Sequence, residues 1–402
     1  MGAMSASQGI RAGARLTAGT QAGSAVALGG MLALAAGMGI GRFVYAPILP
    51  DMAFALRVDA SAAGLIASAN FLGYLAGAIL VALSRLPGSR RGWFLAGLTV
   101  SAASTAAMAA ASTMVPFLLL RFIGGVASAC VLVLGSALVL DHLAAVQRQH
   151  RAAVHFAGVG VGIAISSVLV DLLQAANAGW RWEWLASGAV SAFALPLAAW
   201  LMPRATTSPP ATAASRTHHR LPPGIGALTL CHGLFGFGYV VTATFLVGVA
   251  RSTLHSHDLE AVVWLAVGLA AAPSTALWGR IGISIGPLPA YAVACLVEAA
   301  GVAVGGVWPS AAGALIAAVL LGGTFMGITA LGFSAARALA PQQQHRSFAV
   351  ITAGFGLGQI LGPSVAGLLL DRTQSFAAPS LLAAAAVAIA AAMTLGVSCR
   401  AG

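Results

Sequence analysis

The sequence contains no lysine and few charged residues of any kind. Its 20 basic residues are all arginines, its acidic residues number only 9, and charged residues make up 7% of the 402 positions. A soluble domain carries roughly a quarter charged residues. Hydrophobic residues reach 59% and the mean hydropathy is +0.93. The composition therefore excludes a soluble domain and predicts a protein whose solvent is a lipid bilayer.

Several chemical signatures are also missing. The net charge of +11 comes from arginines scattered between apolar runs, without the aromatic-interleaved basic patches that bind nucleic acid. None of the four cysteines forms a C-x-x-C pair. No Walker-type loop, hydrolase triad or metal-ligand cluster occurs at a sensible spacing. We therefore expect no nucleic-acid binding, no metal, no cofactor and no enzymatic activity, and an energy source other than ATP.

What the sequence does contain is a series of long apolar runs. A membrane-spanning helix needs about 20 apolar residues, and twelve stretches reach or approach that length. They are roughly 24–49, 61–84, 92–112, 115–140, 151–174, 181–202, 224–249, 258–279, 288–307, 310–338, 347–370 and 376–398.

One connection differs from the others. Residues 203–223 are rich in Pro, Ser, Thr and Ala, which is typical of a flexible linker. The linker divides the chain into a tail (1–23), a six-helix bundle (24–202), a second six-helix bundle (224–398) and a short end (399–402).

The arginines indicate the orientation of these helices. If the N-terminus is inside, fourteen arginines fall in inner loops and termini, four in outer loops, and Arg42 and Arg121 inside helices. The excess of arginine on one side predicts that both termini and the linker are cytoplasmic.

The two predicted bundles repeat each other. The segment GIGRFVYAPILP from Gly39 aligns with GFGYVVTATFLV from Gly236, and QRQHR (147–151) aligns with QQQHR (342–346). The glycines at 158, 160 and 162 match those at 354, 356 and 358. Parallel repeats around a central cavity are an architecture of secondary transporters.

These features resemble the major facilitator superfamily over essentially the whole chain. LLLRFIGGVASA (118–129) is similar to the arginine–glycine motif of its fourth helix, and GQILGPSVAG (358–367) to its glycine–proline antiporter motif. The strings GIGRFVYAPILP, VGLAAAPSTALWGR, GGTFMGITALG and GFGLGQILGP together resemble the bacterial YbfB/YjiJ-type branch. The resemblance implies an all-α fold of two parallel six-helix repeats and a transporter of small molecules in the bacterial inner membrane. We expect the protein to be a monomer.

Two arginines inside predicted helices are the main candidates for a binding site. Arg42 and Arg121 are expected at similar depths below the outer surface, in the first and fourth helices. A mid-membrane arginine costs roughly 3 kcal/mol and should face a cavity or a partner. Either arginine could bind an anionic substrate group or a coupled carboxylate. Alternatively, each could cap backbone carbonyls and hold the first, fourth and fifth helices together.

Other polar side chains could complete the site. Tyr45 lies one turn beyond Arg42, and Tyr239 is the counterpart of Arg42 in the second repeat, so both could line the cavity or simply pack. Thr324 and Gln359 could hydrogen-bond substrate from the second half or bond between helices. Gly37, Gly39 and Gly41 indicate close helix contact or local unwinding that frees backbone groups beside the cavity.

A proton gradient is the simplest energy source, and few groups could carry the proton. Glu298 in the ninth predicted helix, His155 and His232 are the titratable candidates, with Arg121 as a residue that tunes proton affinity. We expect a proton-coupled secondary transporter of a small molecule, with an organic anion as one candidate substrate. Efflux of drugs, sugars or other neutral metabolites, exchange, uniport and a receptor role stay open.

Overall fold

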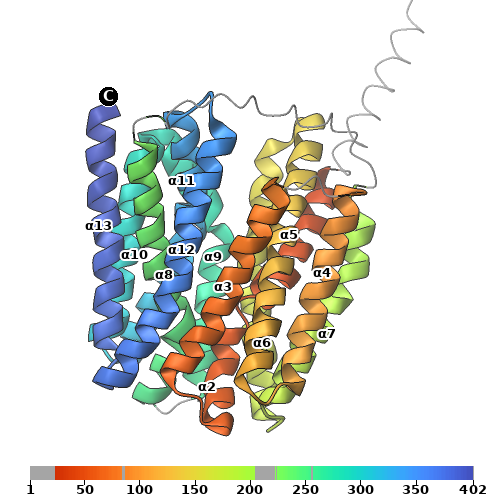
Figure 1. Cartoon of the computed structure of the whole chain (residues 1–402), viewed down its shortest axis with the longest axis vertical. Helices are drawn as coiled ribbons and strands as arrows, with labels where there is room; N and C mark the ends of the chain where they lie inside the picture. Colours follow the sequence, from red (N-terminus) through yellow and green to blue (C-terminus); the bar gives the residue numbers. More distant parts are fainter. Residues whose placement is uncertain (1–22, 84–86, 204–221, 223, 255–256, 402) are drawn as a thin grey trace, which may run out of the picture.

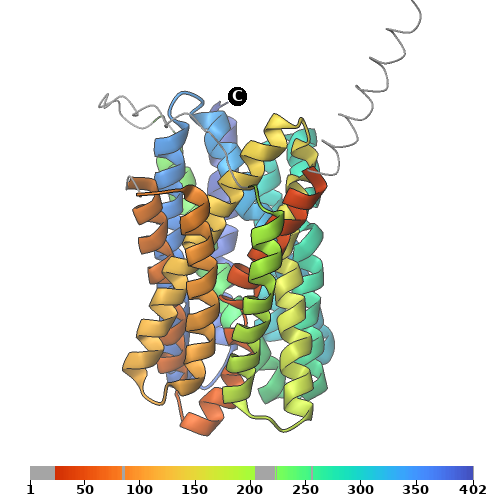
Figure 2. The ribbon, with the colours of Figure 1, turned by 90° about the vertical axis from the view of Figure 1, so that its right-hand side faces the viewer.

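Twelve helices long and apolar enough to cross a membrane lie side by side, the number predicted (Figures 1 and 2). The computed structural model describes residues 23–83, 87–203, 222, 224–254 and 257–401. Most of the predicted linker and nearly all of the predicted N-terminal tail lie outside these described residues. No β-strand occurs in the described part of the chain.

The first span, Gly23–Leu56, contains a π-helical segment η1 (Ala35–Ile40) and ends as helix α2 (Tyr45–Leu56). The other five spans of the first half are formed by α3 (Ala60–Leu83), α4 (Arg90–Ala107, extended by the 3-10 turn η2 at Met108–Ala110), α5 (Met114–Ala145), α6 (Ala152–Ala175, preceded by the 3-10 turn η3 at Gln149–Arg151) and α7 (Trp180–Leu201). The second half consists of α8 (Ile225–Leu254), α9 (His257–Ile285), α10 (Pro287–Val307), α11 (Ala311–Leu339), α12 (Gln344–Thr373) and α13 (Ala377–Ala401).

The helices form two bundles, one from each half of the chain (Figure 1). The bundles meet mainly through two helix pairs, α3 against α12 and α6 against α9. Glycine permits the second contact, since a Cβ at Gly160 of α6 would lie 2.3 Å from the backbone nitrogen of Ala272 in α9. A Cβ at Gly268 would similarly lie 2.5 Å from the nitrogen of Ala164. Close backbone approach through small residues is typical of helix packing in membranes.

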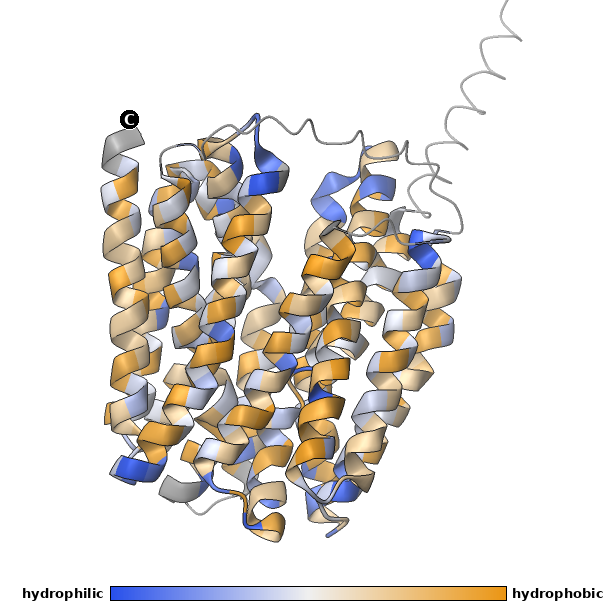
Figure 3. Cartoon of the chain, in the orientation of Figure 1, coloured by the Kyte–Doolittle hydropathy of each residue, from blue (hydrophilic) through white to orange (hydrophobic). Residues whose placement is uncertain are grey.

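The molecule has two polar ends and an apolar middle (Figure 3). We call the end where α13 finishes the C-terminal face, and the opposite end, where α2 meets α3, the distal face (Figure 1). Hydrophilic residues gather at these two ends, while hydrophobic residues cover the length of the helices between them (Figure 3). This distribution is what a bilayer requires of a spanning protein.

The first helix extends further than the sequence predicts. Its end was expected near Pro50, but α2 continues to Leu56 and stops where Arg57 adopts a left-handed conformation (φ 54°). The chain turns between Gly41 and Val44 before α2 begins, and Pro50 lies inside α2 without ending it. Membrane helices tolerate such prolines because neighbouring groups satisfy the freed backbone. More residues therefore separate Arg42 from the end of its helix than the sequence predicts.

Candidate functional site

The glycine-rich segment of the first span departs from regular α-helix. Residues Ala35–Ile40 form a π-helical turn in which the Gly41 nitrogen donates to the Ala36 carbonyl (2.9 Å). A Cβ at Gly39 would lie 2.5 Å from the Cα of Gly162 in α6, so only glycine fits there. Both readings of these glycines, close contact and local unwinding, are confirmed. π-Helical turns inside membrane helices often mark functional positions.

Arg121 of α5 holds this irregular segment. Its guanidinium donates to the carbonyl oxygens of Gly41 (3.3 Å) and Arg42 (3.1 Å) and lies 5.0 Å from the centre of the Tyr45 ring. The backbone carbonyl of Arg121 accepts from the Asn70 amide of α3 (2.9 Å). These contacts connect the first span with α3 and α5, which corresponds to the capping role considered for Arg121.

Arg42 has a different environment, although it is equally buried at 4% exposure. Its guanidinium lies 4.5 Å from the ring centre of Phe71 and 4.4 Å from that of Tyr74, both on α3. Its Nε and Nη2 atoms are buried without a hydrogen-bond partner. Among the described residues, no carboxylate forms an ion pair with Arg42 or Arg121. Arg42 is thus a buried cation held by aromatic rings, with donors to spare.

A cavity of about 550 Å³ lies between the two bundles, in the half of the molecule nearer the C-terminal face. Most of its lining is apolar, five lining residues carry hydroxyl groups, and none carries a formal charge. The lining residues are Tyr74, Leu75, Ala78, Ile79, Ala82, Leu132, Val133, Ser136, Leu140, Phe156, Thr275, Met326, Thr329, Ala330, Phe333, Phe348, Ala349, Thr352, Ala353 and Phe355.

Arg42 lies directly behind the wall of this cavity. The Tyr74 ring lines the cavity and contacts the Arg42 guanidinium through its face. None of the residues predicted to line a cavity, namely Arg42, Tyr45, Arg121, Tyr239, Thr324 and Gln359, contributes directly to this lining. Arg42 and Arg121 are brought together, while Tyr45 is turned away because its hydroxyl donates to the Ala63 carbonyl (2.8 Å).

Aromatic rings from the second half form the opposing wall. Tyr239 of α8 stacks on Phe355 (5.8 Å between ring centres), and Phe355 lines the cavity. The Gln359 amide donates to the Tyr239 hydroxyl, while its Oε1 atom is buried without a partner. Tyr239 and Gln359 therefore form one polar pair behind Phe355, as Arg42 lies behind Tyr74.

The remaining candidates from the sequence do not line the cavity themselves. Thr324 donates to the buried carboxyl of Glu298 (3.0 Å), which joins α11 to α10. His155 pairs through Nε2 with Ser136 (3.0 Å), a residue of the cavity lining. His232 pairs through Nδ1 with the Tyr291 hydroxyl (3.1 Å) and is surrounded by aromatic rings.

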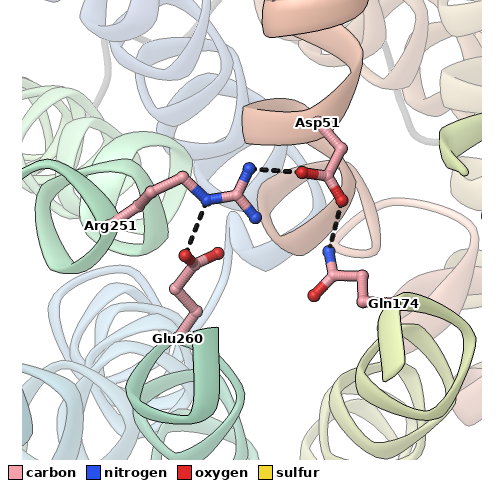
Figure 4. A network of polar contacts seen from close by, with 4 residues as sticks. All are labelled: Asp51, Gln174, Arg251 and Glu260. Atoms are coloured by element: carbon pink, nitrogen blue, oxygen red, sulfur yellow. Dashed lines mark hydrogen bonds and ion pairs between the residues drawn. The ribbon is translucent and has the colours of Figure 1, made fainter. Parts of the chain in front are cut away.

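The distal face carries a second polar group, the distal cluster, formed by Asp51, Gln174, Arg251 and Glu260 (Figure 4). Arg251 of α8 donates to Asp51 of α2 and, through Nε, to Glu260 of α9 (2.6 Å). Asp51 also accepts from the Gln174 amide of α6 (2.8 Å). The Asp51–Arg251 pair crosses from one half of the chain to the other and closes the distal end.

A further contact closes the same face. The carboxylate of Asp371 at the end of α12 accepts from the backbone nitrogens of Ala60 (3.1 Å) and Ser61 (2.8 Å) at the start of α3. The charge of Asp371 thus lies at a helix N-terminus, where it is favoured. Both α3–α12 and α2–α8 are therefore joined at the distal face, while the cavity occupies the other end.

Sequence reasoning missed Glu183 and the distal cluster. Asp51, Glu183 and Glu260 fall near the ends of predicted helices, where acidic residues are ordinary. In the structure Glu183 and Glu260 are buried, at 0% and 3% exposure. No sequence signal singles these three out, because eight of the nine acidic residues lie near predicted helix ends. Within the described residues, no group of three or more His, Cys, Asp and Glu side chains could hold a metal ion.

Comparison with solved structures places the fold among membrane transporters. The chain is similar to the nucleoside transporter NupG, with 13% identity, a TM-score of 0.72, and coverage of 93% of this chain and 99% of that one. It is also similar to a bacterial homologue of the human lysosomal transporter Spinster in an inward-facing, occupied conformation. That match has 17% identity and a TM-score of 0.73, and it covers 93% of this chain and 95% of the homologue. At these identities the likeness shows the fold alone.

Comparison of the sequence itself is more specific. None of the curated proteins matches the chain. The family described as "Uncharacterised MFS-type transporter YbfB" matches residues 34–395, a range that reaches into all twelve spans. The chain therefore belongs to the YbfB-type family of the major facilitator superfamily of membrane transporters.

Proposed function

We propose that the protein is a secondary transporter of a small amphipathic organic anion, that it works by alternating access across the bacterial inner membrane, and that a proton gradient drives it. The negative charge of the substrate is supported by the environment of Arg42. Its buried guanidinium has two unpartnered nitrogens and lies directly behind the cavity wall. A buried charge without a partner is costly, and an anion that enters the cavity would supply the partner.

The cavity suggests the rest of the substrate. Its lining is mainly aliphatic and aromatic, with hydroxyl groups from Tyr74, Ser136 and three threonines. Such a pocket favours an apolar body with a few polar contacts. Movement of the Tyr74 ring, which separates cavity and guanidinium, would let an acidic group reach Arg42. The substrate is therefore an apolar or aromatic body that carries one acidic group.

The asymmetry of the molecule supports alternating access. The two halves are joined at the distal face by Asp51–Arg251 and by Asp371, while the cavity lies toward the C-terminal face. If the arginine-rich C-terminal face is cytoplasmic, as the positive-inside rule indicates, this is an inward-facing arrangement. The opposite arrangement requires these distal contacts to break.

Binding of three matched probes tests whether the site prefers an anion. We would measure thermal stabilisation of the purified protein by 1-naphthalenesulfonate, 1-naphthalenemethanol and 1-naphthylmethylamine, which share a ring system and differ in charge. The sulfonate should stabilise the protein, Arg42→Ala should weaken its binding about tenfold or more, and Arg42→Lys should restore part of it because the charge remains without the planar fork. Arg372→Ala, which removes an exposed arginine at the end of α12, is the matched control. Equal binding of the sulfonate to wild type and Arg42→Ala would reject the anion site.

A neutral substrate is the second candidate, and the uncharged cavity lining favours it. In that case the alcohol would bind as well as the sulfonate and Arg42→Ala would change neither. Vesicles that contain the protein separate the driving forces. Uptake of the permanently charged sulfonate should follow an imposed pH difference and collapse with a protonophore, whereas uptake that needs only a counter-substrate would indicate an exchanger.

A further inference from the structure

Glu183 is the most unusual ionisable residue of the distal face. It lies in the first turn of α7 with 0% exposure, and neither carboxyl oxygen has a hydrogen-bond partner. A buried carboxyl group with so few donors is poorly stabilised as an anion.

The polar and charged groups around Glu183 come from three other helices. Asp51 of α2 and Arg251 of α8 lie close enough to interact with it electrostatically, and the Gln174 amide of α6 faces it as well. The π-turn η1 and the 3-10 turn η2 contain no charged residue, and the charged residues of α4, Arg90 and Arg91, lie at its other end. Arg181, on the same helix, donates instead to the Ala109 and Ala111 carbonyls.

The charges of this group do not balance if every carboxyl group is ionised. Among the described residues, Arg251 is a cation that bonds to both Asp51 and Glu260. An ionised Glu183 would be a second negative charge beside Asp51 in a fully buried position, so the neutral acid is favoured in this closed arrangement. Glu183 therefore holds a proton here.

The same group is divided between the two moving halves. Asp51, Gln174 and Glu183 belong to the first half, whereas Arg251 and Glu260 belong to the second half. Opening of the distal face would move Arg251 away and admit water to Glu183. A hydrated carboxyl group loses its proton more readily than a buried one, so the two arrangements differ in proton affinity.

We propose that Glu183, beside Asp51, is a proton-binding site that controls closure of the distal face: it takes up a proton from the distal side as that face closes and releases it to the same side when the face opens. This inference rests on the proposed alternating access and makes one of its two arrangements dependent on pH. The sign follows from linkage. Because the closed state binds the proton more tightly, closure is favoured at low pH and lost as pH rises.

Labelling of a buried interface residue can report the closure without any substrate. Ser68 of α3 is 6% exposed and donates to the Ile360 carbonyl of α12 (2.7 Å), so Ser68→Cys is shielded while the distal face is closed. We would label it with a membrane-impermeant maleimide from outside right-side-out vesicles. Ala176→Cys, exposed on the same face, corrects for thiol ionisation and also tests the orientation, since it must react from outside.

The corrected labelling rate should rise between about pH 5.5 and about pH 8.5, by up to tenfold per pH unit for one linked proton. Glu183→Gln mimics the protonated acid, so it should label slowly at every pH. Asp51→Asn removes the ion pair to Arg251 and should label fast at every pH. Glu298→Gln removes a buried carboxyl group inside α10, a helix of the second half. It is the matched control and should keep the wild-type pH response.

Several outcomes would overturn the proposal. These are a pH response that survives Glu183→Gln, one that is lost in Glu298→Gln, or labelling that follows sodium concentration at constant pH. If Glu183→Gln does not fold, the infrared spectrum of the wild-type protein decides, because deprotonation on opening must remove a carbonyl band of a protonated carboxyl group. Loss of the anion site would show in naphthalenesulfonate binding to Arg42 variants and would leave these results unchanged.

Discussion

Arg42 and Arg121 are buried to the same extent, yet their guanidinium groups are compensated differently. Arg121 donates to two backbone carbonyls that the irregular first span exposes. Arg42 contacts aromatic faces and keeps two unpartnered nitrogens. Arg121 leaves only its Nε without a partner and contributes to stability through both Nη atoms, while Arg42, with more spare donors behind the cavity wall, is available to a ligand. The two arginines therefore divide into a structural and a binding role.

This division predicts unequal effects on stability. Arg121→Ala should lower the unfolding free energy by about 2 kcal/mol or more, because it leaves two buried carbonyls without donors. Arg42→Met, which keeps the side-chain volume, should change it by less than about 1 kcal/mol, since the lost cation–π contacts are offset by the removal of an unpaired charge. Thermal unfolding of both variants in the same detergent measures the difference. An equal loss for both would mean that Arg42 is structural too.

The sequence could predict part of the site at this scale. It indicates that Arg42 and Arg121 share a depth, because helix direction and length follow from the apolar runs. It could not indicate that Asp51 and Glu183 meet, since that depends on how α2 and α7 pack. Nor could it show that Tyr74, an ordinary aromatic of an apolar run, lies between the cavity and Arg42.

At the scale of the element, the first span shows the limit of reading helices from hydropathy. The twelve runs predict the helices well, because length and apolarity are what a bilayer selects. The run of small residues around Gly39 allowed two interpretations, and the structure combines them. The contact with Gly162 in α6 is tight, and the backbone is locally unwound. The end of the helix was placed too early because Pro50 was read as a terminator.

The tight contact at Gly39 can be tested against a glycine that has room. Gly39→Ala should lower the unfolding free energy by about 3 kcal/mol, since its Cβ would lie 2.5 Å from the Gly162 Cα and 2.6 Å from the Val159 carbonyl oxygen. Gly248→Ala in α8, where nothing lies within 4 Å of the added Cβ, should raise it by up to about 1 kcal/mol through helix propensity. Comparison of unfolding midpoints tests both, and tolerance of Gly39→Ala would show that the π-turn can shift.

At the scale of the whole molecule, the two halves behave as bodies joined at few points. The repeat seen in the sequence predicts two bundles, and the structure shows their contact through α3–α12 and α6–α9. No sequence pattern could predict which end is closed, because the conformations with the distal face closed and open use the same helices. The polar contacts show which end is closed in the described structure. Asp371 and the distal cluster join the halves at the distal face, and the cavity lies at the other.

If each half moves as a rigid body, weakening the contact between α3 and α12 should also loosen the contact between α6 and α9. Asp371→Asn weakens the α12–α3 contact by removing a charge from the N-terminus of α3. The reporter is Ser167→Cys on the other pair, since Ser167 of α6 is 1% exposed and donates to the Ala261 carbonyl of α9 (2.7 Å). Its labelling from the distal side should increase several-fold.

Asp59→Asn provides the matched control for this test. Asp59 accepts from the Ala62 nitrogen (2.7 Å) at the same end of α3, but it belongs to the first half and makes this bond within its own helix. Its loss should cost about 1 kcal/mol of helix capping and leave the labelling of Ser167→Cys unchanged. If both variants raise the labelling equally, the effect is local fraying of α3. If neither does, the α6–α9 contact holds independently and the halves do not open as bodies.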